Sequence, residues 1–179
     1  MTTAGGPAVL RTFYDGWANQ QQQLLDVIRP LTDGQMRLRP ASDQWAIWQL
    51  ASNMAGGRAY WFGEILGEGD ADVRDMFRVA STTIPGLPPE DAGWEDDEDH
   101  PRSAAEVVDA FEKTWRIVDD CLQRWTAEDL RVEFSRQRRG QTQSCTRAWV
   151  IWHLIEHELQ HGAEIAIILR SHGLPSLDI

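Results

Sequence analysis

Three histidines are the residues of this 179-residue chain whose spacing points most directly to chemistry. His153, His157 and His161 fall in the segment WVIWHLIEHELQHGAEI, each four residues from the next. Residues four apart on an α-helix lie on one face with Cβ atoms about 5–6 Å apart, so two imidazoles can bind one ion at about 2.0–2.1 Å. A helix over this segment would therefore supply two ligands for a divalent metal ion.

The apolar residues of the same segment indicate which histidine pair faces inward. The residues that share the spacing of the last two histidines are Val150, Leu154, Ile165 and Ile168. We therefore predict that His157 and His161 face the interior. His153 lies at the edge of that face, where it would contact a neighbouring helix or supply a hydrogen bond to the site.

The alternative is that the pair consists of core histidines satisfied by hydrogen bonds. Each unsatisfied buried polar group costs about 1–3 kcal/mol, and this cost favours the metal site. The nearby carboxylates Glu156, Glu158 and Glu164 are able to orient an imidazole, but glutamate is also an ordinary helix former. We predict that these three side chains are exposed.

The elements that must position these residues are helices. Apolar residues recur at helical spacing over residues 10–30, 47–65, 103–125 and 146–171. Ser103 with Glu106 predicts a capping box at the start of the third helix. The chain is predicted to be one domain over residues 1–179, all-α, a four-helix bundle with a long crossover between helices 2 and 3.

Two connecting segments lack the apolar spacing of a helix. Residues 81–102 contain four prolines and the acidic run Glu95 to Asp99, which we interpret as a solvated surface loop, with a cation site as the alternative. Residues 131–140 show too little alternation to indicate a sheet, and we predict an extended loop.

The composition narrows the class of protein. A formal net charge of -11 repels nucleic acid, which we exclude as a partner. No apolar stretch approaches the roughly 18 residues of a membrane span, so a soluble, cytoplasmic protein without a membrane partner is expected. Cys121 and Cys145 do not form a CxxC pair, which argues against a disulfide framework or a thiolate zinc site.

The sequence resembles the DinB-like proteins (the DinB/YfiT group), which include mycothiol-dependent maleylpyruvate isomerase and bacillithiol or mycothiol S-transferases. The resemblance covers nearly the whole chain and is strongest in QWAIWQLASNMAGGRAYW and WHLIEHELQHGAEIAIILRSHGLP. It implies an up-down-down-up helical bundle, often a homodimer, with a divalent metal held by three histidines. Two of these correspond to His157 and His161 of this chain.

The third ligand of the family falls on Asn53, eight residues after Trp45, so this sequence departs from the pattern. An amide oxygen is a weaker ligand for zinc or nickel than an imidazole nitrogen. Three outcomes are open: Asn53 ligates through its oxygen or a water, His153 or a carboxylate takes its place, or the site has lost its metal. We favour a weakened site.

The resemblance implies a metal-dependent thiol transferase or isomerase that acts on a small-molecule substrate with a thiol such as mycothiol or bacillithiol. A metal with an open position lowers the pKa of a bound water or thiol. Arg136, Arg138 and Arg139 are candidates to bind the anionic thiol or an acidic substrate, the alternative being an exposed basic loop.

Tryptophans at helical spacing form a candidate pocket lining, although such residues more often belong to a core. They are Trp48, Trp61, Trp149 and Trp152. A second hypothesis for the function is a non-catalytic, stress-related bundle that binds small molecules and has lost its metal, and Asn53 favours it. A third is a structural role through dimerisation.

Overall fold

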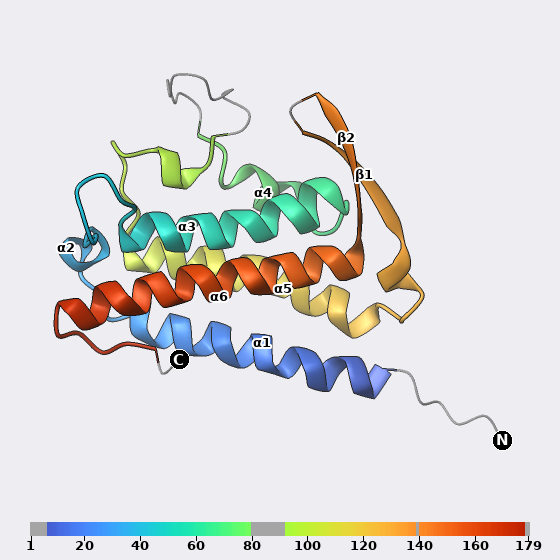
Figure 1. Ribbon diagram of the computed structural model, residues 1–179, viewed down its shortest axis with the longest axis horizontal. Coiled ribbons are helices and arrows are strands. Elements are labelled where there is room, and N and C mark those ends of the chain that lie inside the picture. Colours follow the sequence, from blue (N-terminus) through green and yellow to red (C-terminus); the bar gives the residue numbers. More distant parts are fainter. Residues whose placement is uncertain (1–6, 80–91, 139, 178–179) are drawn as a thin grey trace.

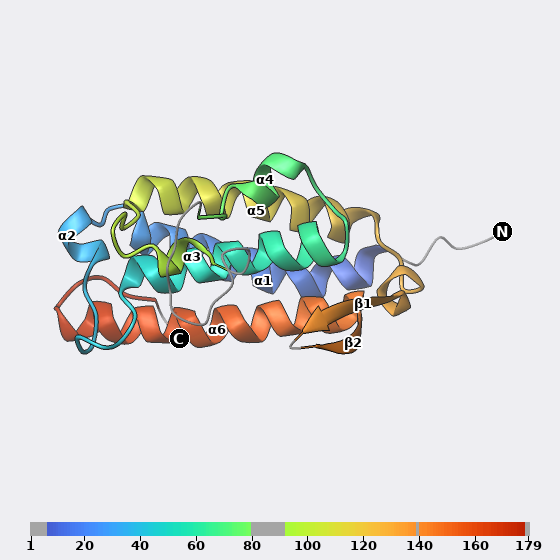
Figure 2. The same ribbon diagram turned by 90° about the horizontal axis from the view of Figure 1, so that it is seen from above.

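Four long helices lie side by side along the length of the molecule (Figures 1 and 2). The structure is a computed structural model that describes residues 7–79, 92–138 and 140–177. The long helices are α1 (Pro7–Ile28), α3 (Ile47–Arg58), α5 (Ala104–Arg124) and α6 (Arg147–Ser171). A π-helix, η1 (Ala59–Ile65), continues α3. These bounds confirm the helical segments predicted from apolar spacing.

The helix ends follow from capping chemistry. Ser103 Oγ accepts a hydrogen bond from the Glu106 backbone N–H at 3.3 Å, and Glu106 Oε2 accepts one from the Ser103 N–H at 2.8 Å. The predicted capping box of α5 is thereby confirmed. Thr146 caps α6 by accepting from the Trp149 N–H at 3.1 Å, and α6 ends just before Gly173, whose φ is +68°.

Short elements join the long helices. They are α2 (Asp33–Met36), α4 (Ala71–Asp75), η3 (Trp94–Asp96) and η4 (Asp129–Arg131). Part of the predicted crossover, residues 80–91, lies outside the described residues. The described part is divided between core and solvent. Its start packs on the helices, since η3 contacts α3 and Trp94 is buried against Phe77 with ring centres 4.9 Å apart, whereas residues 98–100 are exposed as predicted.

The chain is mostly helical, as predicted, but the extended loop predicted at residues 131–140 was wrong, because a β-hairpin precedes α6. Strand β1 (Glu133–Arg138) pairs antiparallel with β2 (Gln141–Thr146), and Gly140 has a φ of +72° between them. Cross-strand polar pairs hold the two strands together. Arg136 Nη2 donates to Gln143 Oε1 at 2.9 Å, and Gln137 Nε2 donates to Thr142 Oγ1 at 2.7 Å.

A buried ion pair lies in the centre of the helices. Arg58 of α3 donates from Nε and Nη2 to the two carboxylate oxygens of Glu158 of α6, both at 2.6 Å. Trp17 Nε1 of α1 donates to the same carboxylate at 2.8 Å, and Gln21 Oε1 accepts from Arg58. Glu158 is only 2% exposed, so the prediction that it faces solvent was wrong.

No helix in the described part of the chain is long and apolar enough to cross a membrane.

Candidate metal centre

The contact between α3 and α6 positions the histidines. The two helices run antiparallel and side by side (Figure 1). Gly57 of α3 faces His157, since a Cβ placed on Gly57 would lie 3.8 Å from His157 Cε1. The imidazole therefore lies against the backbone of α3, where the missing side chain of the glycine leaves room for the ring.

His157 and His161 come together as predicted. Their ring centres are 4.5 Å apart and the ring planes are perpendicular at 88°. His157 Nδ1 is buried and has no hydrogen-bond partner among the described residues. Burial, with the neighbouring His161 and His153, lowers the pKa of His157 to about 4. Its imidazole is therefore neutral at neutral pH, which is the form that binds a metal.

A carboxylate fixes the second ring. His161 Nδ1 lies 2.8 Å from Glu164 Oε2, and only the nitrogen can donate in such a pair. In the neutral ring this leaves Nε2 with a free lone pair, an arrangement common to metal-binding histidines. The side chain of Glu164 is 42% exposed and that of His161 is 12% exposed. Glu164 is therefore only partly exposed, and its carboxylate orients the His161 ring.

His153 packs among aromatic rings at one end of the histidine row. Its ring stacks on Trp149 at 4.8 Å and meets Trp61 of η1 edge-on at 5.2 Å. The predicted contact with a neighbouring helix is thus confirmed. The ring centre of His153 lies 6.1 Å from that of His157, so the three histidines form a continuous row along α6.

Asn53 lies one helical turn before Gly57 on α3 and binds a residue that sequence reasoning missed. Its Nδ2 donates to Glu95 Oε1 at 2.7 Å. Glu95 was interpreted as part of a solvated loop, and this was wrong because its side chain is turned in against α3. Burial raises the pKa of Glu95, while the hydrogen bond from Asn53 and the nearby His161 oppose that rise.

The residues present fit a metal site with two strong ligands. Within the described ranges no three His, Cys, Asp or Glu side chains are grouped so as to hold a metal ion. His157 and His161 supply two imidazoles, and the unpartnered Nδ1 of His157 is a polar atom that a cation would satisfy. A third protein ligand has to be of another type, and the amide oxygen of Asn53 is the candidate from the sequence.

The predicted arginine cluster is described only in part. The Arg136 guanidinium carbon lies 4.4 Å over the Trp61 ring, so the hairpin extends the aromatic row that begins at His153. Arg139 and the side chain of Arg138 lie outside the described residues. Among the predicted pocket tryptophans, Trp48 is 1% exposed and belongs to the core, whereas Trp149 is 43% exposed beside His153.

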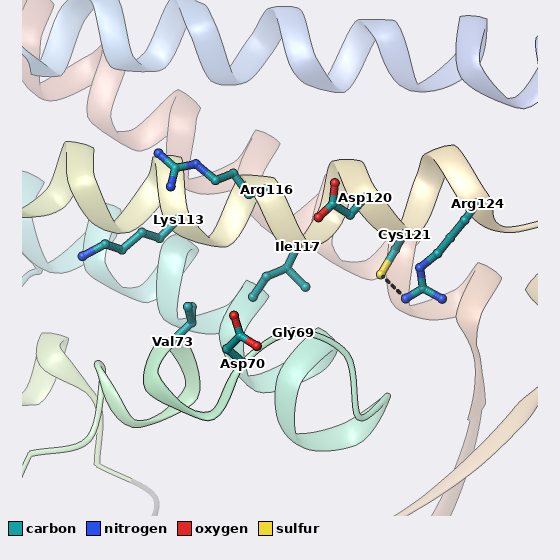
Figure 3. Close-up of a pocket in the computed structure, with 9 residues that line it drawn as sticks. All are labelled: Gly69, Asp70, Val73, Lys113, Arg116, Ile117, Asp120, Cys121 and Arg124. Carbon is teal, nitrogen blue, oxygen red and sulfur yellow. Dashed lines mark hydrogen bonds between the residues drawn. The ribbon is translucent and has the colours of Figure 1, made fainter.

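A pocket of about 400 Å³ lies elsewhere, between α4 and α5, and Cys121 and Arg124 are among the residues that line it (Figure 3). Burial raises the pKa of Cys121 to about 12, so the thiol is protonated and is no nucleophile. The lining mixes cations such as Lys113 with anions such as Asp120 and includes no histidine.

One family model and two solved structures are similar to this chain. The model of the DinB family matches residues 1–179. A DinB-like protein from Bacillus cereus has a solved structure that superimposes with a TM-score of 0.60 at 16% identity, covering 93% of this chain and 95% of that one. A conserved protein from Enterococcus faecalis gives a TM-score of 0.65 at 12% identity, covering 89% and 94%. No curated protein matches the sequence.

Proposed function

We propose that this chain, which belongs to the DinB family, binds a divalent metal ion through His157 and His161, with Asn53 as a third and weaker ligand. The buried Nδ1 of His157 carries the proposal, because it has no protein partner in the described structure. Leaving such an atom unsatisfied costs about 1–3 kcal/mol, and a bound cation offsets that cost.

Zinc or nickel suits this set of ligands. Both accept imidazole nitrogen, and the neutral His157 ring has no proton to lose before it binds. The amide oxygen of Asn53 is a poorer donor than a third imidazole, so we expect weaker binding than in a three-histidine site. A bound ion with an open position would lower the pKa of a water or thiol attached to it.

The proposed reaction is transfer or isomerisation that uses a low-molecular-weight thiol such as mycothiol or bacillithiol. The row of rings from His153 through Trp61 to Arg136 offers a flat surface that ends in a positive charge. An anionic group of the thiol or substrate would bind the guanidinium through charge-assisted hydrogen bonds. Arg138 and Arg139 would add positive charge at the same hairpin.

Titration with Zn²⁺ and Ni²⁺ tests the metal proposal. We expect binding by the wild type, its loss in His157→Ala, and a large gain in affinity in Asn53→His, since that change restores a third imidazole. Thiol transfer should fall in Arg136→Ala and remain unchanged in Arg29→Ala, an exposed arginine just after α1 that pairs with Glu112. No change of metal affinity in any variant would refute the site.

A second candidate function is metal-free binding of small molecules in a stress-related protein. Asn53 favours it, because its amide stands where the resemblance places a third imidazole. In that case the wild type would bind neither Zn²⁺ nor Ni²⁺. The metal titration therefore distinguishes the two functions.

We further propose that two copies associate through α6 as a homodimer of DinB-type bundles in the cytoplasm. Trp152, Leu159 and Ile167 are 58%, 46% and 57% exposed and lie on the side of α6 away from its buried face. Large exposed apolar side chains on one side of a helix are able to form part of a protein interface. Sedimentation of Leu159→Glu beside the wild type tests it, and identical masses at the monomer value would refute it.

The free thiols Cys121 and Cys145 are consistent with a reducing compartment.

A further inference from the structure

The segment that carries Glu95 is attached to α3 without using the Glu95 side chain. Gln49 Nε2 donates to the backbone oxygen of Glu95 at 2.9 Å, and Gln49 is itself 2% exposed. Trp94 is buried beneath the guanidinium of Arg102, whose carbon lies 4.6 Å from the ring centre. The carboxylate of Glu95 is therefore not needed to hold the segment in place.

Asn53, which donates to the Glu95 carboxylate, lies at the same position along the contact between α3 and α6 as the histidine pair. Gln49, Asn53 and Gly57 are spaced four apart and so share one face of α3. In the antiparallel contact with α6, Gly57 meets His157, while Trp45, which precedes α3, has its ring centre 5.9 Å from that of His161. Asn53 lies between these two points along the helix, beside the pair.

We propose that Glu95 is a positioning residue of the metal centre, whose carboxylate holds Asn53 Nδ2 so that the amide Oδ1 is presented to the histidine pair. This inference rests on the proposed metal site. A carboxylate can only accept, so it fixes which end of the amide faces it. The hydrogen bond also draws electron density towards Oδ1 and makes a neutral amide a better ligand, as carboxylates do for metal-bound histidines.

Gly93 makes room for this arrangement. A Cβ placed on Gly93 would lie 2.8 Å from Glu95 Cδ, closer than atoms in contact approach. Gly93→Ala must therefore displace the Glu95 carboxylate, although it changes none of the proposed metal ligands. The hydrogen bond from the Gly93 backbone N–H to the side-chain oxygen Oδ2 of Asp96, at 3.0 Å, would be unaffected.

A double-mutant cycle tests the inference, with Zn²⁺ affinity measured by competition with a chromophoric chelator. Loss of a residue that orients a metal ligand typically lowers affinity by about 10–100-fold. We expect a fall of about tenfold in Glu95→Ala and in Gly93→Ala, and no further fall when either change is added to Asn53→Ala. Glu95→Gln keeps an oxygen acceptor and should recover most of the affinity.

Each other outcome overturns a stated part of the account. Equal losses with and without Asn53 would show that Glu95 binds the metal directly, and an unchanged affinity in Glu95→Ala would show that it has no role. If Asn53→His binds Zn²⁺ and the wild type does not, Asn53 is not a ligand, but His157 and His161 still form part of a metal pocket. Absence of binding in both proteins would refute the metal site itself. Thermal midpoints measured without metal should agree among the variants and so exclude unfolding as the cause.

Discussion

Replacing Glu158 with alanine should destabilise the fold by about 3–5 kcal/mol, because the change leaves the guanidinium of Arg58 buried without its counter-ion. The side chains of Arg58 and Glu158 are 0% and 3% exposed, so water cannot substitute for the missing carboxylate. Trp17 Nε1 would also lose its acceptor, at a further cost of about 1–3 kcal/mol.

Three contacts of the Arg58 guanidinium remain after the change. Gln21 Oε1 still accepts from Arg58, and the guanidinium carbon lies 5.1 Å from the ring centres of both Phe111 and Trp115. Each such cation–π contact is worth about 0.5–2 kcal/mol, and these contacts are present before and after the change. Because these contacts cancel from the difference, the expected loss is the cost of about 3–5 kcal/mol for the ion pair, raised by the cost at Trp17, which is a large part of the about 5–15 kcal/mol typical of a whole domain.

Urea denaturation followed by tryptophan fluorescence measures this loss. Glu112→Ala is the matched control, because it breaks an exposed pair with Arg29 and should cost less than about 1 kcal/mol. The double change Arg58→Met with Glu158→Leu removes both charges and should recover most of the stability. Equal losses in Glu158→Ala and Glu112→Ala would refute the reasoning.

Three further outcomes are expected. The pKa of His157 is about 4 in the folded chain and about 6.5 in unfolded peptides, so between these pH values the unfolded state binds a proton that the folded state does not. The free energy of unfolding of the metal-free protein should therefore fall as the pH is lowered from about 6.5 to 4, and it should fall less in His157→Gln. Iodoacetamide at pH 8 should leave Cys121 unmodified in the native protein and alkylate it in urea, since burial raises its pKa to about 12; rapid native alkylation would contradict this. Gly16→Ala, in the exposed middle of α1 with nothing within 4 Å of the new Cβ, should raise the free energy of unfolding by about 0.5–1 kcal/mol, and a lower thermal midpoint would argue against that helix.

The sequence predicts the helices well because each one carries its own signals. Apolar spacing located the four long helices, and the Ser103 box and Gly173 marked two of the ends. The hairpin was missed because its strands are almost wholly polar and are stabilised by partners across the turn, such as Arg136 with Gln143. The pattern of polar and apolar residues along one strand does not show which residues pair across the turn.

The candidate site was predictable only along one helix. Spacing within α6 identified His157 and His161, because residues four apart on a helix must lie together. Glu95 and Glu158 were misassigned because their partners, Asn53 and Arg58, are distant in sequence. An acidic run and a helical glutamate are usually solvated, and only the packing of other helices against them decides otherwise.

The metal content of the purified protein tests the central claim most directly. The protein, prepared without a chelating tag, is analysed by elemental mass spectrometry beside His157→Ala with His161→Ala. We expect zinc, nickel or another divalent ion in the wild type, close to stoichiometric after incubation with the ion, and its loss in the double variant. Absence of metal from both proteins, even after incubation with excess ion, would contradict the account and favour a metal-free binding protein.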